Sequence, residues 1–354
     1  MSAEIINLID KLAADRSLSL DEWSAAVKGF SPDTAAYAAQ IALEKRREIY
    51  GNSVYIRGLI EISNVCKNDC LYCGIRKSNK NCERYRLSKE EILACCKEGY
   101  ALGFRTFVLQ GGEDPYYTDE ILCDIVHSIK ASCADCAVTL GMGERGYESF
   151  KRLFYAGADR YLLRHETADE THYRKLHPEN MSYKARMACL DALRDIGYQV
   201  GCGMMVGSPY QTAEHLARDL KFIETFSPDM CGIGPFIPHA QTPFRDFKAG
   251  GAELTCYLLS LVRIQKPNIL LPATTALGTV DPDGREKGLL AGANVVMPNL
   301  SPDGVRGKYL LYDNKICTGD EAAQCVKCLA KRVEKTGFQI VQNRGDIKKS
   351  KEQN

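Results

Sequence analysis

The chain has 354 residues, 45% of them apolar, and a formal net charge of +1. This length allows one large α/β domain or two small ones, and the near-neutral charge gives no general attraction to nucleic acid or anionic membranes. The sequence has no run of 18 apolar residues, and its first ten residues carry acids where a secretion signal has basic residues. We therefore expect a cytoplasmic protein that binds neither nucleic acid nor membrane.

Residues 1–53 are predicted to form helices that cover the domain that follows. Ser31 directly before Pro32 is a typical helix start, because serine caps the helix and proline fits its first turn. This segment contains none of the sixteen cysteines. In a reducing compartment we expect those cysteines to be metal ligands or buried thiols and not disulfides.

From residue 54 onward, apolar strands alternate with amphipathic helices, which is the pattern of a parallel sheet flanked by helices. Eight strands are predicted, at 54–62, 106–110, 137–140, 160–163, 199–206, 230–233, 269–271 and 294–297. Helices are predicted between them, at 88–103, 118–132, 147–156, 183–196, 212–226, 254–264 and 283–291.

Residues 54–300 match the length of about 250 residues of a complete (β/α)8 TIM barrel, which is the fold class that we predict. A doubly wound open sheet is the second choice, because no glycine-rich dinucleotide turn follows the first strand. Residues 301–342 are predicted to form a small C-terminal cap. Residues 343–354, rich in Lys, Asn and Gln, are predicted to be a disordered tail.

Three cysteines, Cys66, Cys70 and Cys73, follow the first predicted strand with CX3CX2C spacing. Three thiolates on one loop can hold three irons of a 4Fe-4S cluster, and the fourth iron then keeps an open position for a reactant. The motif, with Tyr72 before its last cysteine, resembles that of the radical S-adenosylmethionine (SAM) enzymes. In that family the open iron chelates SAM, and the reduced cluster cleaves it to a 5'-deoxyadenosyl radical. A zinc knuckle completed by Cys82 or another cysteine is the alternative.

In a (β/α)8 barrel the reacting groups lie at the carboxyl ends of the strands. The second strand ends in Gly111, Gly112 and Glu113. This run resembles the GGE motif that holds the SAM amino group in the radical SAM family, because glycines allow close approach of backbone carbonyls. Without a ligand, the same residues would form only a tight turn before the next helix.

The fourth strand ends in Arg164, His165 and Glu166, which need partners or a ligand inside a barrel. Arg186 on the next helix is a candidate for the SAM carboxylate, since a guanidinium group can bind a carboxylate through two bonds. A structural ion pair between Glu166 and Arg186 is the alternative, and His165 alone could be a core histidine. Further candidates for cofactor binding are Tyr72, Thr139 and Met297.

Four longer segments, 110–116, 160–167, 232–239 and 272–275, closely resemble the HydE-type maturases of FeFe-hydrogenases. The resemblance extends from the N-terminal helices to about residue 330. Gly111 departs from the small hydroxyl residue expected there. The resemblance implies radical attack on a sulfur of an iron-bound cysteine that carries carbonyl and cyanide ligands and is delivered by a partner maturase.

The same resemblance implies further partners, namely the other hydrogenase maturases and reduced ferredoxin or flavodoxin as electron donor. An anionic iron complex needs local positive charge or hydroxyl donors. Our candidates for contact with that substrate are Arg164, His165, Thr274, Thr275 and Tyr309.

A second cysteine triplet, Cys317, Cys325 and Cys328, has CX7CX2C spacing near the C-terminus. It resembles the accessory iron-sulfur site found in some HydE proteins, which implies a second 2Fe-2S or 4Fe-4S cluster. A zinc site or incidental thiols are the alternatives, because three ligands without a fourth leave the metal undetermined.

Other functions stay open at this point. Methylornithine synthase, a lysine mutase, has a similar organisation, and the fourth strand offers the acid and the arginine that an amino acid substrate needs. Biotin synthase fits less well, because only Cys202 is placed to hold its second cluster. A non-catalytic iron-sulfur carrier or scaffold is a further alternative from a different class.

Overall fold

The computed structural model describes residues 2–316 and 326–348. The helices are α1 (Ser2–Asp15), α2 (Leu20–Lys28), α3 (Pro32–Tyr50), α4 (Lys89–Ala101), α5 (Asp119–Ser132), α6 (Tyr147–Tyr155), α7 (Glu170–Leu176), α8 (Tyr183–Ile196), α9 (Ala213–Phe226), α10 (Ala252–Gln265), α11 (Thr275–Val280), α12 (Gly284–Leu290), α13 (Asp303–Arg306) and α14 (Val326–Glu334). The strands are β1 (Ser53–Ile56), β2 (Gly58–Ser63), β3 (Thr106–Gly111), β4 (Ala137–Gly141), β5 (Arg160–Leu162), β6 (Gln199–Val206), β7 (Met230–Pro235), β8 (Val295–Val296) and β9 (Gln339–Val341).

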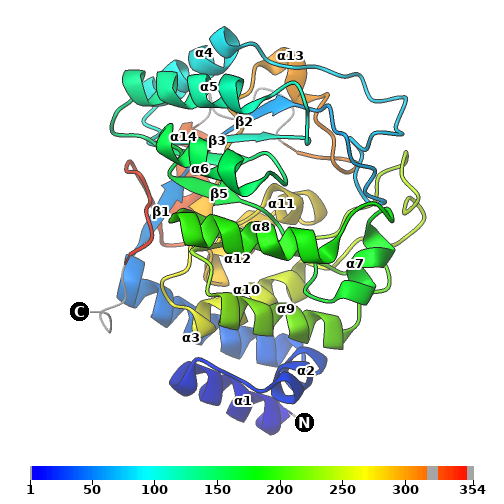
Figure 1. Ribbon diagram of the computed structural model, residues 1–354. Coiled ribbons are helices and arrows are strands. Elements are labelled where there is room, and N and C mark those ends of the chain that lie inside the picture. The colour runs from blue at the N-terminus through cyan, green and yellow to red at the C-terminus, as the bar shows by residue number, and fades with distance from the viewer. Residues whose placement is uncertain (1, 317–325, 349–354) are drawn as a thin grey trace.

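The strands form a closed parallel barrel with helices outside (Figure 1). One sheet has the order β2-β3-β4-β5-β6-β7, and a second has the order β8-β1-β9. Isolated parallel bridges from Met230 to Leu270, from Pro272 to Val295 and from Leu59 to Asn299 join the two sheets. The predicted barrel class is therefore confirmed.

Two predicted strands differ in detail. The strand expected at 54–62 is divided at Arg57, because β1 pairs with β8 and β9 whereas β2 pairs with β3. The segment expected as the strand 269–271 contributes only single bridging residues. The helices α7 and α11 were not predicted, since both are short.

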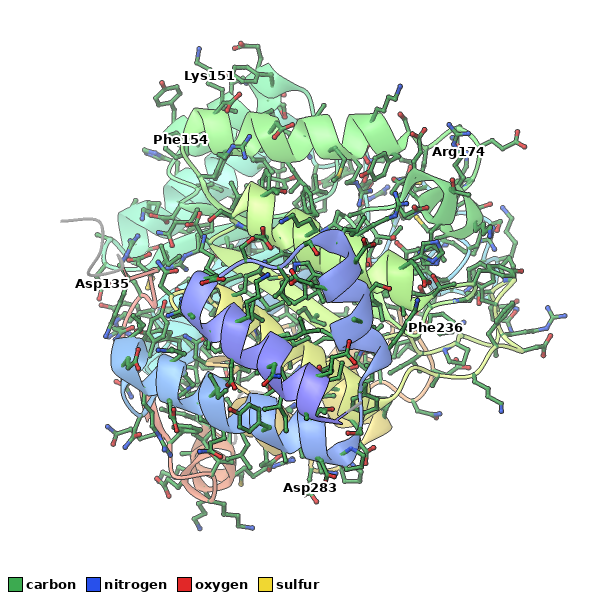
Figure 2. The ribbon with its side chains drawn as sticks, turned by 90° about the horizontal axis from the view of Figure 1, so that it is seen from below. Asp135, Lys151, Phe154, Arg174, Phe236 and Asp283 are labelled. Carbon is green, nitrogen blue, oxygen red and sulfur yellow. The ribbon has the colours of Figure 1, made fainter. Side chains whose placement is uncertain are left out.

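The predicted helix starts rest on side-chain caps. Ser88 Oγ accepts a hydrogen bond from Glu91 N over 3.2 Å, and Glu91 Oε2 accepts one from Ser88 N over 2.7 Å. Such a reciprocal cap stabilises a helix by about 1 kcal/mol. The N-terminal helices α1, α2 and α3 lie across α9 and α10 (Figure 2), where buried Trp23 donates its Nε1 proton to Glu224 over 3.0 Å. None of the described helices combines the length and apolarity that crossing a bilayer requires.

Strand alternation divides the buried residues into two sets. Tyr161, Val138 and Phe107 belong to the main apolar core between the strands and the outer helices. Their neighbours along the same strands, such as Arg160 and Thr139, face the barrel interior instead. The barrel interior therefore carries polar side chains.

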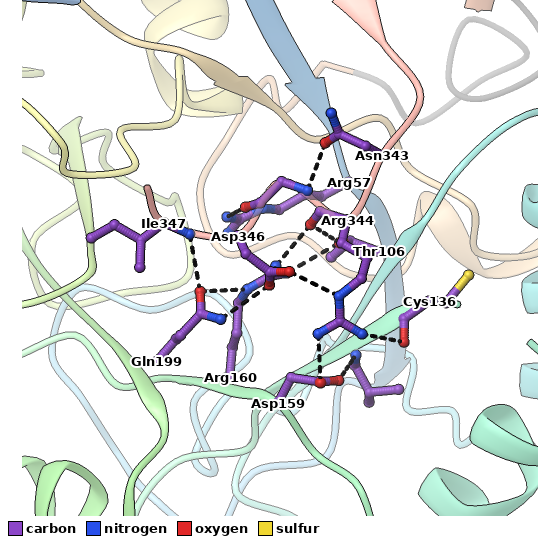
Figure 3. A network of polar contacts seen from close by, with 12 residues as sticks. Arg57, Thr106, Cys136, Asp159, Arg160, Gln199, Asn343, Arg344, Asp346 and Ile347 are labelled. Carbon is purple, nitrogen blue, oxygen red and sulfur yellow. Dashed lines mark hydrogen bonds and ion pairs between the residues drawn. The ribbon is translucent and has the colours of Figure 1, made fainter. Parts of the chain in front are cut away.

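At the amino ends of the strands, residues 343–348 pack against the barrel, although we expected a disordered tail from residue 343. They contribute to a polar cluster that we call the floor network (Figure 3), which consists of Thr106, Asp159, Arg160, Gln199, Arg344 and Asp346. Arg160 donates to Thr106, Gln199 and Asp346, and Arg344 donates to Asp159. Residues 349–354 lie outside the described part.

Candidate active site

The loop after β2 carries the three cysteines of the CX3CX2C motif, and their side chains are half-buried. Backbone hydrogen bonds fix this loop at the carboxyl ends of the strands. Lys67 N donates to Glu113 O over 2.9 Å, and Leu71 N donates to Leu176 O over 3.0 Å. The loop after β3 and the end of α7 therefore hold the motif in place at what we call the barrel mouth.

The three thiols of the motif lie close to one another. Burial raises the pKa of Cys66, Cys70 and Cys73, and for Cys70 the nearby thiols of the other two raise it further. The three sulfurs are thus close enough to influence one another. Within residues 2–316 and 326–348, however, no three His, Cys, Asp or Glu side chains converge on one metal ion. Three thiols on one loop are the donor set that three irons of a 4Fe-4S cluster need, and that cluster stays a prediction here.

The two glycines after β3 allow close packing against the cysteine loop. A Cβ atom on Gly112 would lie 2.2 Å from Val65 O and 2.8 Å from Cys66 Cβ, so only glycine fits there. Glu113 Oε1 accepts a hydrogen bond from Glu144 N over 3.0 Å, and its Oε2 lies 3.2 Å from Lys67 Nζ. Glu113 therefore joins the loops after β2, β3 and β4, while Gly111, exposed only in part, lies at the end of β3.

Tyr72, before the last cysteine of the motif, is oriented by a histidine. Its hydroxyl lies 3.2 Å from His177 Nε2, and His177 Nδ1 lies 3.0 Å from the carbonyl of Tyr173. Burial lowers the pKa of His177 to about 3, so the ring is neutral. Because the carbonyl can only accept, Nδ1 carries the proton and Nε2 accepts from Tyr72.

Arg164 and Glu166 lie together at the mouth, as predicted from the end of the fourth strand. Arg164 Nη2 donates to Met204 O over 2.7 Å and lies 3.2 Å from Glu166 Oε2. That pair is within ion-pair distance but lacks hydrogen-bond geometry, and both Arg164 Nε and Glu166 Oε2 are buried without a hydrogen bond. Glu166 also has a left-handed backbone with φ of 64°. Such strain in a non-glycine residue is typical of functional sites.

His165 does not lie in the mouth, which corrects its proposed contact with substrate. Its ring is fully buried in the helix layer, where Nε2 lies 3.3 Å from Asp219 Oδ1 and the ring packs against Phe222 of α9. The contact with Asp219 is an ion-pair distance without hydrogen-bond geometry. Side chains alternate along an extended segment, so the residue between Arg164 and Glu166 faces outward.

Arg186 of α8 points toward the same mouth but already has partners. Its Nε donates to Glu144 Oε1 over 2.6 Å, and its Nη1 donates to Arg164 O over 2.5 Å. The alternative ion pair with Glu166 does not form, because Glu166 lies beside Arg164 instead. Arg186 therefore positions Arg164 through the hydrogen bond to its backbone carbonyl. The role of Arg186 as a ligand of the SAM carboxylate stays a prediction.

Thr139 and Met297 are placed inside the barrel. Thr139 is buried in β4, and its Oγ1 has no hydrogen-bond partner in the described structure. An unpaired buried hydroxyl costs about 1 to 3 kcal/mol, so a ligand that bonds to it would recover that energy. Met297 packs against a small apolar cluster that includes Tyr55, Met230 and Leu270. Thr139 is thus the better placed of the two for polar contact with a cofactor.

Tyr309 is part of a buried polar chain beside the cysteine loop. Its hydroxyl accepts a hydrogen bond from Gln110 Nε2 over 3.3 Å, and its carbonyl accepts one from Lys315 Nζ over 2.8 Å. Lys315 Nζ also donates to Glu61 Oε1 over 2.5 Å, and Asn299 donates to Glu61 Oε2 over 2.9 Å. This chain fastens the segment 309–315 to the inner wall of the barrel at β2.

Thr274 and Thr275 have mainly local partners. Thr274 is the cap of α11, where its Oγ1 accepts a hydrogen bond from Leu277 N over 3.2 Å. Thr275 begins that helix and is half-buried, and its carbonyl accepts a bond from Thr279. Thr274 is nevertheless near the interior, because a Cβ atom on Gly234 of β7 would lie 3.0 Å from its hydroxyl.

The C-terminal cysteine triplet is described only in part. Cys328 lies on α14 with an exposed side chain. Cys317 and Cys325 fall outside the described residues. The predicted second cluster therefore stays a prediction.

Three residues of the mouth were missed in the sequence. Glu144 follows β4 in the run Gly141 to Glu144, a glycine-acid pattern like that after β3, so a signal was present. Glu61 lies inside an otherwise apolar strand, which also could have indicated a buried partner. Nothing in the sequence around Lys315 indicates its long-range contact with Glu61.

Comparison with known proteins agrees with this site. The family model of the radical SAM superfamily matches residues 60–223. The FeFe hydrogenase maturase subunit HydE of Thermotoga maritima is 44% identical over 334 residues, which are 94% of this chain and 94% of that protein. This chain belongs to the HydE family of radical SAM enzymes.

Two other relatives share this HydE-family chain's architecture. The 3-methylornithine synthase of Methanosarcina acetivorans is 28% identical over 93% of this chain and 92% of its own length. The crystal structure of methylornithine synthase (PylB) has a TM-score of 0.82 at 27% identity and covers 94% of this chain and 97% of that chain. The radical SAM family implies one 4Fe-4S cluster and SAM, which fit the three thiols and the unpaired polar atoms of the mouth.

Proposed function

We propose that this HydE-family chain holds a 4Fe-4S cluster at Cys66, Cys70 and Cys73 and cleaves SAM in the assembly of the two-iron subcluster of FeFe-hydrogenase. The observation that carries this proposal is the identity of 44% to HydE over nearly the whole of both chains. The geometry supports it, since the cysteine loop and the glycine loop after β3 pack against each other at the mouth. We place this reaction in the cytoplasm.

When bound, the reduced cluster supplies the electron that cleaves SAM to methionine and a 5'-deoxyadenosyl radical. The chain's own residues bind SAM and orient it. Carbonyls of Gly111 and Gly112 accept from the SAM ammonium group, and Arg186 faces its carboxylate. Glu166 Oε2 and Thr139 Oγ1, both without a hydrogen bond, offer partners to the remaining polar groups of the ligand.

The substrate that we propose is an iron-bound cysteine with carbonyl and cyanide ligands, delivered by a partner maturase. Such an anionic complex is attracted by Arg164, whose Nε has no hydrogen bond, and by the hydroxyls of Thr274, Thr275 and Tyr309. The barrel wall would have to hold the reacting sulfur close to the radical carbon, at the roughly 3 to 3.5 Å of a near-attack arrangement, and exclude water. A second cluster at the C-terminal triplet and reduced ferredoxin or flavodoxin as electron donor complete the proposal.

The test is an anaerobic assay. The protein is reconstituted with iron and sulfide, reduced with dithionite and mixed with SAM, and 5'-deoxyadenosine is measured together with the electron paramagnetic resonance spectrum. We expect SAM to perturb the spectrum and the Cys70→Ser variant to lose both signals. The matched control is Cys82→Ser on the same loop, which we expect to behave as wild type. A cluster that forms but ignores SAM would favour the carrier or scaffold alternative.

Lysine rearrangement is the second candidate, and the TM-score of 0.82 to methylornithine synthase favours it. The pair Arg164 and Glu166 offers opposite charges for the two ends of an amino acid. Mass spectrometry after incubation with lysine and SAM separates the two functions. Methylornithine in the product, with no gain of hydrogenase activity in a maturation assay, would favour the mutase.

A further inference from the structure

Positive charge is concentrated around the cysteine loop. Residues 64–88 contain six Lys or Arg and two Asp or Glu, whereas the whole chain has a net charge of only +1. Some of these cations have structural partners. Arg76 donates to Asp69 over 2.7 Å, Arg86 donates to Asp114 over 2.7 Å, and Arg84 donates to four backbone carbonyls.

Two lysines of this loop are different. Lys77 and Lys80 are exposed, and neither has an acidic partner in the described structure. Lys77 N donates to Asn68 O over 2.8 Å, which places Lys77 directly beside the segment between Cys66 and Cys70. Lys77 therefore lies next to the proposed cluster, Lys80 follows it on the same loop, and neither charge has an acidic partner in the described structure.

Two neighbouring segments add cations to the same face. The end of α7 is joined to the cysteine loop by the bond from Leu71 N to Leu176 O, and it carries the exposed Lys175. The loop 236–250 is joined to it by the bond from Asn81 Nδ2 to Gln241 Oε1 over 2.7 Å, and it carries the exposed Lys248. In Figure 1 the loops after β2 and β7 and helix α7 gather on the right-hand side of the molecule.

An exposed aromatic ring stands within these charges. Tyr210 is 53% exposed and has a left-handed backbone with φ of 65°. Its ring centroid is 5.4 Å from that of Phe247 and 5.4 Å from Lys175 Nζ. Phe247 packs in turn against a small buried apolar cluster, and Leu71 and Tyr72 of the cysteine loop pack against the same cluster. Tyrosine is enriched at the centre of protein interfaces, because it offers a large rigid surface.

We propose that this face, defined by Lys77, Lys80, Lys175, Lys248 and Tyr210, docks an acidic protein that carries one electron. The inference rests on the proposed function, because each SAM cleavage consumes one electron. The reduced carrier loses that electron and the cluster gains it, and no bond forms or breaks in the transfer. Charge complementarity steers such a partner and tolerates a small, short-lived interface.

The opposite end of the barrel is less suited to this role. The floor network there closes the interior with ion pairs, and its cations already face Asp159 and Asp346 (Figure 3). A carrier docked at the floor would also be separated from the cysteines by the length of the barrel. The mouth offers a direct approach to the half-buried thiols.

The test uses a triple charge reversal, Lys77→Glu, Lys80→Glu and Lys175→Glu, in the full reconstituted chain. The probe is an acidic 2Fe-2S ferredoxin, whose binding in the oxidised form is measured at low and high salt. We expect the dissociation constant to rise roughly tenfold or more at low salt and the difference to shrink at high salt. The matched control reverses three exposed lysines, Lys97 of α4, Lys327 of α14 and Lys335 directly after α14, and should leave binding unchanged.

A second measurement separates this proposal from the proposed function. Dithionite needs no docking surface, so the triple variant should cleave SAM at the wild-type rate with dithionite but roughly tenfold more slowly with reduced ferredoxin. A wild-type protein that does not cleave SAM with dithionite would contradict the proposed function itself. If the wild type cleaves SAM normally and the triple variant binds ferredoxin with the same dissociation constant as the wild type, the docking surface is wrong. A reversal that weakens binding to phosphatidylserine vesicles or single-stranded RNA but not to ferredoxin would also overturn it.

Discussion

The two ends of the barrel are both polar, but they use their polar groups differently. At the mouth, Arg164 Nε and Glu166 Oε2 are buried without a hydrogen bond, and so is Thr139 Oγ1 farther inside the barrel. At the floor, Arg160 donates through Nε, Nη1 and Nη2. Buried polar groups without partners destabilise a fold, so they persist where a ligand completes them. The difference indicates that the mouth is built for binding and the floor for stability.

Arg57 lies between these extremes. It stands at the break between β1 and β2, where its Nη1 is 2.9 Å from Met230 Sδ and its Nε has no hydrogen bond. Burial lowers its pKa well below the usual range, and the positive charge of Arg160 lowers it further. Arg57 also donates from Nη2 to Gly345 O over 3.4 Å, so it combines one hydrogen bond to the floor segment with an unpaired Nε.

The largest effect that we expect from this comparison is on stability, from Arg160→Ala. The side chain is fully buried, and its loss leaves Thr106, Gln199 and the carbonyl of Arg344 without their donor. The free energy of unfolding should fall by about 3 kcal/mol, measured from urea denaturation of the metal-free protein.

Arg174→Ala is the control for this change. The Arg174 side chain is 73% exposed and pairs with Glu170 one helical turn away. Figure 2 shows Arg174 at the edge of the molecule. Its loss should change the free energy of unfolding by no more than about 0.5 kcal/mol. Equal effects of the two variants would contradict a structural role for the floor.

Glu166→Gln tests the mouth. The substitution keeps the shape but removes the charge of a carboxylate that has an oxygen without a hydrogen bond. SAM cleavage with dithionite should fall roughly tenfold or more, since a hydrogen bond to a charged group contributes about 1.5 to 3 kcal/mol. The urea midpoint should move little. If Glu166→Gln cleaves SAM at the wild-type rate, Glu166 does not contact SAM.

Threonine-to-valine changes compare the loss of a hydroxyl at the floor, at Thr106, with the same loss inside the barrel, at Thr139. Thr106 Oγ1 accepts from Arg160 over 3.1 Å and donates to Arg344 O over 2.7 Å, so Thr106→Val should lower the free energy of unfolding by about 1 kcal/mol. Thr139→Val removes a hydroxyl without a partner, so stability should stay or rise by up to about 1 kcal/mol. SAM affinity, measured by equilibrium binding, should weaken only in Thr139→Val.

The sequence predicted the mouth better than the floor for a physical reason. Motif spacing and strand ends place Cys66, Gly112 and Glu166 at one edge, because all parallel strands end there. The side chain of His165 points outward because side chains alternate along the strand and the next residue, Glu166, has a left-handed backbone. The charged neighbours on both sides of His165 suggested instead that it faced the mouth. The pairing of β9 with β1 and the contact of Asp346 with Arg160 join residues far apart in the chain, and no local pattern indicates them.

The smallest effect concerns the floor at low pH. Burial alone would raise the pKa of Asp346, but the hydrogen bond from Arg344 and the charge of Arg160 outweigh it and lower the pKa to about 2. An aspartate in the unfolded chain has a pKa of about 3.9, so the folded state binds fewer protons between these values. The stabilisation by Asp346 is therefore complete above about pH 4 and is lost as the pH falls toward 2.

Comparison with Asp346→Asn measures this contribution. The difference in the free energy of unfolding between wild type and variant should be constant from pH 7 to about 5 and should shrink on further acidification. We expect it to stay below about 1 kcal/mol, because the side chain is 39% exposed and solvent screens the charges. A difference that widens on acidification would mean that the folded state holds Asp346 protonated. The floor would then be stabilised by its hydrogen bonds alone, and its contrast with the charged mouth would be sharper.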